Sequence, residues 1–281
     1  MAYTFRSLDA LTIIFISVLF VECSTLHIKL RLLKSELNNS SASIDCSSLN
    51  VNTVRLVTFD LFGALMLTKS SMNRNIASLI PSLSSFDIQK FTDDWIREYV
   101  LFFGKSFSPS ITHHPFRWVI HSSLLKILDS FGLSKTITEN SPTFNALMSI
   151  WGNLEPYPGT THVLKILSRK YQLALLSNGD KETLKAALHV FPSSVNISLL
   201  LSSDFPVNCF KPCSAMYAQA LAAVGGNKNQ VLHVAGSADD AHGARTFGIF
   251  SGALDPLAAD RNPKPCFAFD DIQQLLSFFH L

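Results

Sequence analysis

Polar residues that could carry out chemistry follow several apolar stretches of this 281-residue chain. The candidates at three strand ends are Asp60, Ser177, Asn178, Ser237, Asp239 and Asp240, and Lys211 is the remaining candidate. A carboxylate such as Asp60 can act as a nucleophile and form a covalent intermediate, and a cation within about 4–6 Å keeps a carboxylate ionised. Asp, Ser and Asn are also ordinary turn residues, so the prediction depends on the joint placement of the group.

Strand ends must position these residues. The apolar run 54–59 ends at Asp60 with Gly63 close behind, as a buried strand entering a turn would. Further strands are predicted at 172–176, 197–201, 231–235 and 248–251, with helices at 161–170, 181–190, 214–224 and 239–247. This alternation predicts an α/β fold with a doubly wound parallel sheet. Ligands of such folds bind outside the carboxyl ends of the strands, a crevice that Lys211 could reach from its polar connection.

Residues 70–154 have a different pattern, with apolar residues at spacings of three and four. Helices are predicted at 87–103, 116–131 and 143–151, which indicates a helical cap inserted after the first strand. The predicted domains are therefore an extension at 1–50, a core of 51–69 and 155–281, and a cap at 70–154. Apolar cap residues such as Phe102, Phe103 and Trp118 fit either internal packing or a homodimer face.

Four motifs carry a family resemblance. They are DLFGAL at 60–65, LLSNG at 175–179, KP at 211–212 with Tyr217, and AGSADDAHGAR at 235–245. In order and spacing they resemble the motifs of the haloacid dehalogenase superfamily, which implies a Rossmann-like core with a cap. Most of that superfamily are magnesium-dependent phosphatases, but Phe62 and Gly236 stand where those enzymes carry aspartates. The chain is instead similar to the type II, L-2-haloacid dehalogenase branch.

The resemblance implies a mechanism for a small carboxylate substrate without a metal or organic cofactor. Asp60 would displace halide to form an ester, and water would then hydrolyse the ester to a 2-hydroxy acid. Lys211 would keep Asp60 ionised, Asp240 would orient Lys211 or help activate water, Ser177 would bind the substrate carboxylate, and Asn178 would contribute donors near the halide. The implied substrate-binding residues are Leu61, Phe62 and Ser237.

The chain departs from the branch pattern at three positions. Ala64 replaces a threonine, Ser237 replaces an asparagine, and the cap arginine that assists halide departure falls on Asp93 by simple register. Arg97, four residues later, fits a surface ion pair with Asp93. Two alternatives to a dehalogenase stay open: a phosphatase with a degenerate metal site, and a non-catalytic module with the same fold.

Composition excludes other classes of protein. With 47% hydrophobic and 16% charged residues, the chain is not intrinsically disordered. A net charge of +2 with no basic run argues against a nucleic-acid partner. The five cysteines match neither a disulfide framework nor a zinc site and are expected to be free thiols.

The first fifty residues form an extension whose role stays open. The apolar stretch at 10–21 is too short for a stable membrane span, which needs about 20 residues. Residues 1–23 resemble a secretory signal peptide, and 25–50 have the composition of a linker. The alternatives are secretion, a membrane-proximal anchor, and a cytoplasmic protein whose extension has no targeting role.

Overall fold

The computed structural model describes residues 44–106 and 112–281. The chain divides into two compact units, Met1–Ala42 and Ser43–Leu281. The predicted signal segment at 1–23 and most of the linker therefore lie outside the described residues. The second unit includes 44–50, where Cys46–Ser48 form a short 3-10 helix, η1, so it begins earlier than the predicted boundary at residue 50.

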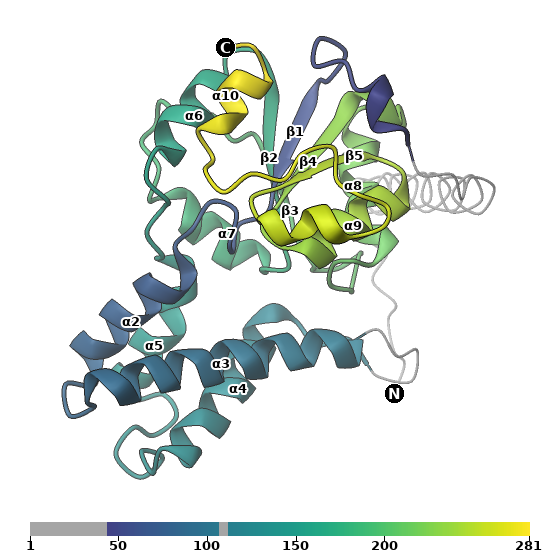
Figure 1. Cartoon of the computed structure of the whole chain (residues 1–281). Helices are drawn as coiled ribbons and strands as arrows, with labels where there is room; N and C mark the ends of the chain where they lie inside the picture. Colours follow the sequence, from purple (N-terminus) through teal and green to yellow (C-terminus); the bar gives the residue numbers. More distant parts are fainter. Residues whose placement is uncertain (1–43, 107–111) are drawn as a thin grey trace, which may run out of the picture. The chain divides into compact units, whose positions relative to one another are not determined.

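A five-stranded parallel sheet forms the centre of this unit (Figure 1). Its strands are β1 (Leu56–Phe59), β2 (Gln172–Leu176), β3 (Leu199–Leu201), β4 (Val231–Ala235) and β5 (Phe250–Ala253). Their order is β3-β2-β1-β4-β5, so the chain changes direction across the sheet at β1, and the predicted doubly wound α/β fold is confirmed. The last strand begins two residues later than predicted because Gly248 takes a φ of 96° and ends the preceding helix.

Helices connect the strands of the sheet. They are α6 (Thr160–Leu167), α7 (Lys181–Leu188), α8 (Ser214–Ala223), α9 (Ala238–Phe247) and the C-terminal α10 (Gln274–Phe278). Short 3-10 helices lie at η3 (Lys228–Gln230) and η4 (Pro256–Asp260). Helix α8 contacts β1, β2 and β3, and α9 contacts β4 and β5, so both helices pack on strands whose ends carry candidate residues.

Helices also fill the long connection between β1 and β2, which we call the cap segment. They are α2 (Thr68–Leu79), α3 (Ser85–Ser106), α4 (Phe116–Ser130), α5 (Pro142–Ser149) and η2 (Ile150–Gly152). The two ends of the segment pair through Leu67 N–H to Glu155 O at 2.8 Å and Tyr157 N–H to Leu65 O at 2.9 Å. Three of these helices were predicted, whereas α2 was not, because its twelve residues include few apolar ones.

The proposed homodimer face stays a prediction. Trp118 is 42% exposed, and the partly buried Phe102 packs on its edge. No helix among residues 44–106 and 112–281 is long and apolar enough to cross a membrane.

The expectation of free thiols is wrong for four of the five cysteines. Disulfides join Cys46 to Cys266 and Cys209 to Cys213. The first pair lies 220 residues apart in the chain, and its Cα atoms are 5.2 Å apart because Cys266 lies beside β5 and η1 packs nearby. Spacing alone could not show this proximity. Cys23 lies outside the described residues.

Candidate active site

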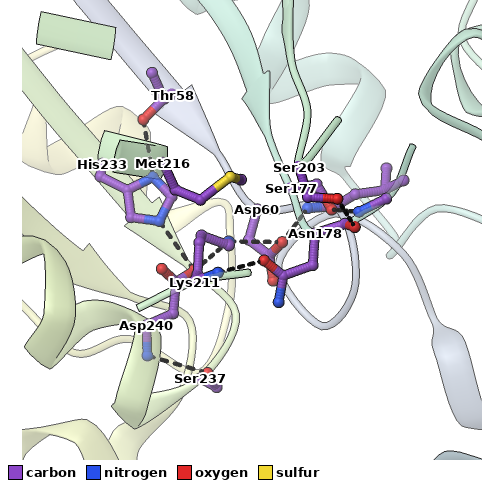
Figure 2. Close-up of polar contacts among 12 residues, drawn as sticks. Thr58, Asp60, Ser177, Asn178, Ser203, Lys211, Met216, His233, Ser237 and Asp240 are labelled. Atoms are coloured by element: carbon purple, nitrogen blue, oxygen red, sulfur yellow. Dashed lines mark hydrogen bonds and ion pairs between the residues drawn. The ribbon is translucent and has the colours of Figure 1, made fainter. Parts of the chain in front are cut away.

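Parallel register brings the candidate residues to one edge of the sheet. Phe59 lies opposite both Leu175 of β2 and Val234 of β4, so the three strands end at nearly the same level. Asp60, Ser177 and the start of α9 consequently follow neighbouring strand ends, and Figure 2 shows them converging with Lys211.

Lys211 lies between two carboxylates. Its Nζ is 2.9 Å from Asp60 Oδ1 and 2.5 Å from Asp240 Oδ2, and the lysine side chain is 4% exposed. The backbone N–H of Lys211 donates to Asn178 Oδ1 at 2.6 Å, so Asn178 helps to fix the loop that carries the lysine. The structure therefore brings together four of the five predicted catalytic residues through direct contacts.

Asp240 has further partners that hold its carboxylate. Tyr217 donates its hydroxyl to Oδ1 at 2.8 Å, and His233 Nε2 lies 3.0 Å from Oδ2. The other ring nitrogen of His233, Nδ1, lies 2.8 Å from Thr58 Oγ1. His233 and Thr58 were not predicted as site residues. The available signal was a histidine in an otherwise apolar strand, which is equally typical of a core position.

Burial and charge shift the pKa values of the three central groups. Burial raises the pKa of Asp60, Lys211 opposes that shift, and Asp240 adds to it. Burial also disfavours the ionised form of Asp240, but His233 and Lys211 hold its pKa well below the usual range. Although burial opposes the charge of Lys211, the two carboxylates raise its pKa above the ordinary value. Asp60 and Asp240 thus compete for a single buried cation.

The remaining predicted residues have distinct positions. Ser177 is fully buried directly after β2. Leu61 is also buried, and its N–H donates to Asp60 Oδ1 at 2.8 Å. Phe62 stacks on Phe116 of α4 with ring centroids 5.5 Å apart, which links the turn after β1 to the cap segment.

Ser237 and its neighbour Asp239 face solvent. Ser237 is the N-cap of α9 and accepts the N–H of Asp240 at 3.4 Å, so it positions the backbone of that residue. Asp239 pairs with Arg261 at 2.6 Å and takes no part in the contacts around Lys211. The predicted role of Ser237 in substrate binding stays a prediction.

The cap segment contributes a tyrosine to the site. Tyr99 of α3 is buried, and burial together with the charge of Asp60 raises its pKa well above the ordinary value. The apolar spacing of the predicted helix at 87–103 indicates only a packing role for Tyr99. Asp93 instead pairs with Lys69 at 2.7 Å on the surface. The expected pairing of Arg97 with Asp93 is wrong, because Arg97 pairs with Asp94, one residue nearer in the helix, at 2.7 Å.

Gly236 excludes an aspartate at the position where magnesium-dependent relatives carry one. A Cβ atom added there would lie 2.5 Å from Phe62 O and 2.6 Å from Ala64 N, both of which are backbone atoms. Among the described residues there is also no group of three or more His, Cys, Asp or Glu side chains that could hold a metal ion. The donor set therefore does not fit a resident magnesium ion.

Comparison with known proteins assigns the family. The model of the haloacid dehalogenase-like hydrolases matches residues 54–248, and the chain belongs to this family. It is 27% identical over 202 residues to (S)-2-haloacid dehalogenase 4A of Burkholderia cepacia. The aligned region covers 71% of this chain and 82% of that protein.

Solved structures share the fold. A defluorinating L-2-haloacid dehalogenase superposes with a TM-score of 0.72 at 20% identity, covering 86% of this chain and all of that one. The L-2-haloacid dehalogenase of Xanthobacter autotrophicus with chloropropionic acid covalently bound gives a TM-score of 0.61 at 21% identity, covering 72% of this chain and 78% of that one.

Proposed function

We propose that this hydrolase is a 2-haloacid dehalogenase in which Asp60 is the nucleophile. The observation that carries the proposal is the buried Asp60–Lys211–Asp240 group in a site with no metal-binding donor set. A phosphoryl transferase needs cations to neutralise the equatorial phosphate oxygens, and this arrangement leaves one lysine shared by two carboxylates. Displacement of halide from a carbon atom makes a smaller demand for positive charge.

The contacts of Asp60 indicate which oxygen attacks. Leu61 N–H and Lys211 Nζ both donate to Oδ1, and within the described part of the chain no hydrogen bond to Oδ2 is found. Oδ2 therefore keeps its lone pairs for the substrate. It would form a bond to C2 while the carbon–halogen bond breaks, and the halide would leave with the bonding electrons.

Water completes the proposed reaction. It would attack Cγ of the Asp60 ester, and cleavage of the bond between Cγ and Oδ2 would release the 2-hydroxy acid with Oδ2 as its hydroxyl oxygen. One proton of the water would go to the leaving oxygen and the other to solvent, while Asp240, the second carboxylate on Lys211, would orient the lysine. In total, a 2-haloacid and water give a 2-hydroxy acid, halide and a proton.

Neutral donors and an apolar wall complete the proposed site. The Ser177 hydroxyl would bind the substrate carboxylate. Asn178 Oδ1 accepts the Lys211 N–H, which leaves its Nδ2 as a donor near the leaving halide. Leu61, Phe62 and Tyr99 would exclude water from the reacting atoms, which strengthens polar interactions there.

Chloride release from 2-chloropropionate without added magnesium tests the proposal. Asp60→Asn should reduce release by at least about a thousandfold, as loss of a nucleophile does. Asp239→Asn is the matched control, because it removes an exposed aspartate from the same region and should leave release unchanged. Turnover of phosphate esters alone, and only with magnesium, would favour the phosphatase alternative. A folded protein with neither activity would favour the non-catalytic module.

A further inference from the structure

A buried histidine lies directly behind the proposed catalytic group. His233 in β4 is 0% exposed, and both of its ring nitrogens have partners, Asp240 Oδ2 for Nε2 and Thr58 Oγ1 for Nδ1. Figure 2 shows this line of contacts from Thr58 through His233 to Asp240. An ionised carboxylate only accepts hydrogen bonds, so Nε2 donates to Asp240.

Thr58 fixes the orientation of the ring. Thr58 and His233 lie opposite each other on the paired strands β1 and β4, so their contact is set by the sheet register. With the proton on Nε2, a neutral ring has its lone pair on Nδ1, and the Thr58 hydroxyl donates to it. The sheet itself thus aims an N–H group at Asp240.

The balance of charge among the buried groups determines what this N–H group can do. Asp60 and Asp240 carry two buried negative charges, and Lys211 supplies one positive charge between them. Each hydrogen bond that Asp240 accepts from another group weakens its interaction with the Lys211 ammonium. Tyr217 supplies one such interaction at Oδ1, and His233 supplies the other at Oδ2.

We propose that His233 is a positioning residue of this site: by donating to Asp240 it holds the second carboxylate and leaves the Lys211 ammonium to serve Asp60. The inference rests on the proposed function. His233 touches no reacting atom and acts through Asp240.

The direction of its effect follows from the groups around it. The ring faces Asp240 of α9, Thr58 of β1 and Tyr217 of α8, whose ring centroid is 5.8 Å away, and the charges of Asp60 and Lys211 lie beyond Asp240. Burial raises the pKa of Asp60, and Lys211 opposes that shift. Without the N–H of His233, Asp240 would interact more strongly with the Lys211 ammonium and leave less of it for Asp60. Loss of His233 should therefore raise the pKa of the nucleophile and move the acid limb of kcat/KM to higher pH.

His233→Phe tests the inference, with His233→Gln as the conservative variant that can still donate to Asp240. Ser251→Ala is the matched control, because Ser251 is the sheet partner of His233 on β5 but donates to Ala241 O at 2.8 Å. We expect His233→Phe to lower kcat roughly tenfold, the size of losing a hydrogen bond to a charged group, with little change in KM. The acid limb of kcat/KM in His233→Phe should move up by about one pH unit. His233→Gln should restore part of the lost kcat and part of the shifted acid limb. Ser251→Ala should alter only the free energy of unfolding.

A measurement that needs no substrate separates this inference from the proposed function. The carboxyl ¹³C resonance of Asp60, assigned with Asp60→Asn, is titrated in the wild type and the variants. A midpoint raised in His233→Phe supports the positioning role even if no halide is released, in which case only the proposed function fails. If His233→Phe does not fold, Thr58→Val should raise the midpoint in the same direction. An unchanged midpoint in folded His233→Phe, or an equal change in Ser251→Ala, would overturn the inference.

Discussion

Replacement of Lys211 by methionine removes the cation that lies between the buried carboxylates of Asp60 and Asp240. The lysine Nζ lies 2.9 Å from Asp60 and 2.5 Å from Asp240, and all three side chains are buried. An adjacent cation lowers a carboxyl pKa, so Lys211→Met should raise the pKa of Asp60 further above its ordinary value. Each unit lowers the ionised fraction about tenfold below the pKa. We therefore expect kcat/KM at pH 7 to fall, by up to about tenfold for each unit by which the pKa of Asp60 rises.

The same substitution should destabilise the fold. Removing one partner of a buried ion pair costs about 3–5 kcal/mol because the other charge stays buried and unpaired. Although burial opposes its charge, Asp240 and Asp60 raise the pKa of Lys211 in the folded protein. Its contribution is then fully present below the ordinary lysine pKa of about 10.4 and is lost as pH rises through the raised folded value.

Halide release measured from pH 6 to 10, together with urea unfolding, checks both effects. Activity of Lys211→Met should recover partly at high pH, where Asp60 ionises again. Adding Asp240→Asn to this variant should restore part of the lost stability, because one buried carboxylate then remains. A folded Lys211→Met protein with near wild-type kcat/KM at pH 7 would refute the assigned role of the lysine.

Three further predictions concern the ester, a close backbone contact and a disulfide. In a single turnover in H₂¹⁸O with enzyme in excess, mass spectrometry should find the label in Asp60 and not in the product hydroxyl, whereas direct attack of water on C2 would label the product. Gly236→Ala should cost about 1–3 kcal/mol in urea unfolding, because the new Cβ meets backbone atoms of the turn at 62–64; an unchanged midpoint would contradict this contact. Cys46→Ala with Cys266→Ala should lower the free energy of unfolding by about 2–5 kcal/mol. In this double variant, a reductant should no longer lower the free energy of unfolding by breaking the Cys46–Cys266 bond.

Much of the sheet and of the polar group could be predicted because both depend on local pattern. A buried parallel strand is a short apolar run, and its carboxyl end is marked by the polar residue that follows, as at Asp60 and Ser177. Parallel strands place these ends side by side, so residues more than a hundred positions apart could be assigned to one site. Lys211 was already a candidate because its polar connection could reach the same crevice, and the motif resemblance then gave it a role.

The missed features depend on contacts between distant segments. Cys46 and Cys266 are 220 residues apart in the chain, and only the tertiary fold brings them together. His233 has the pattern of a core residue, and its role depends on the contact with Asp240 of α9. Tyr99 matches the apolar spacing of its helix, and only the docking of α3 places it within reach of the charge on Asp60. In each case, the sequence specifies the residue type and the tertiary fold specifies its partner.

The position of Asp93 changes what the site can use to bind an anionic substrate. The position expected to hold the cap arginine is Asp93, which pairs with Lys69 on the surface. Arg97 pairs with Asp94 on the same surface, so neither position supplies a cation to the site. Among the described side chains, Lys211 is already shared by two carboxylates, so in the proposed reaction neutral donors such as the Ser177 hydroxyl would recognise the substrate carboxylate. Substrate binding should then be weak, and Ser177→Ala should raise KM more than it lowers kcat. If kcat fell instead with KM unchanged, Ser177 would act on the transition state, and the substrate carboxylate would need another partner.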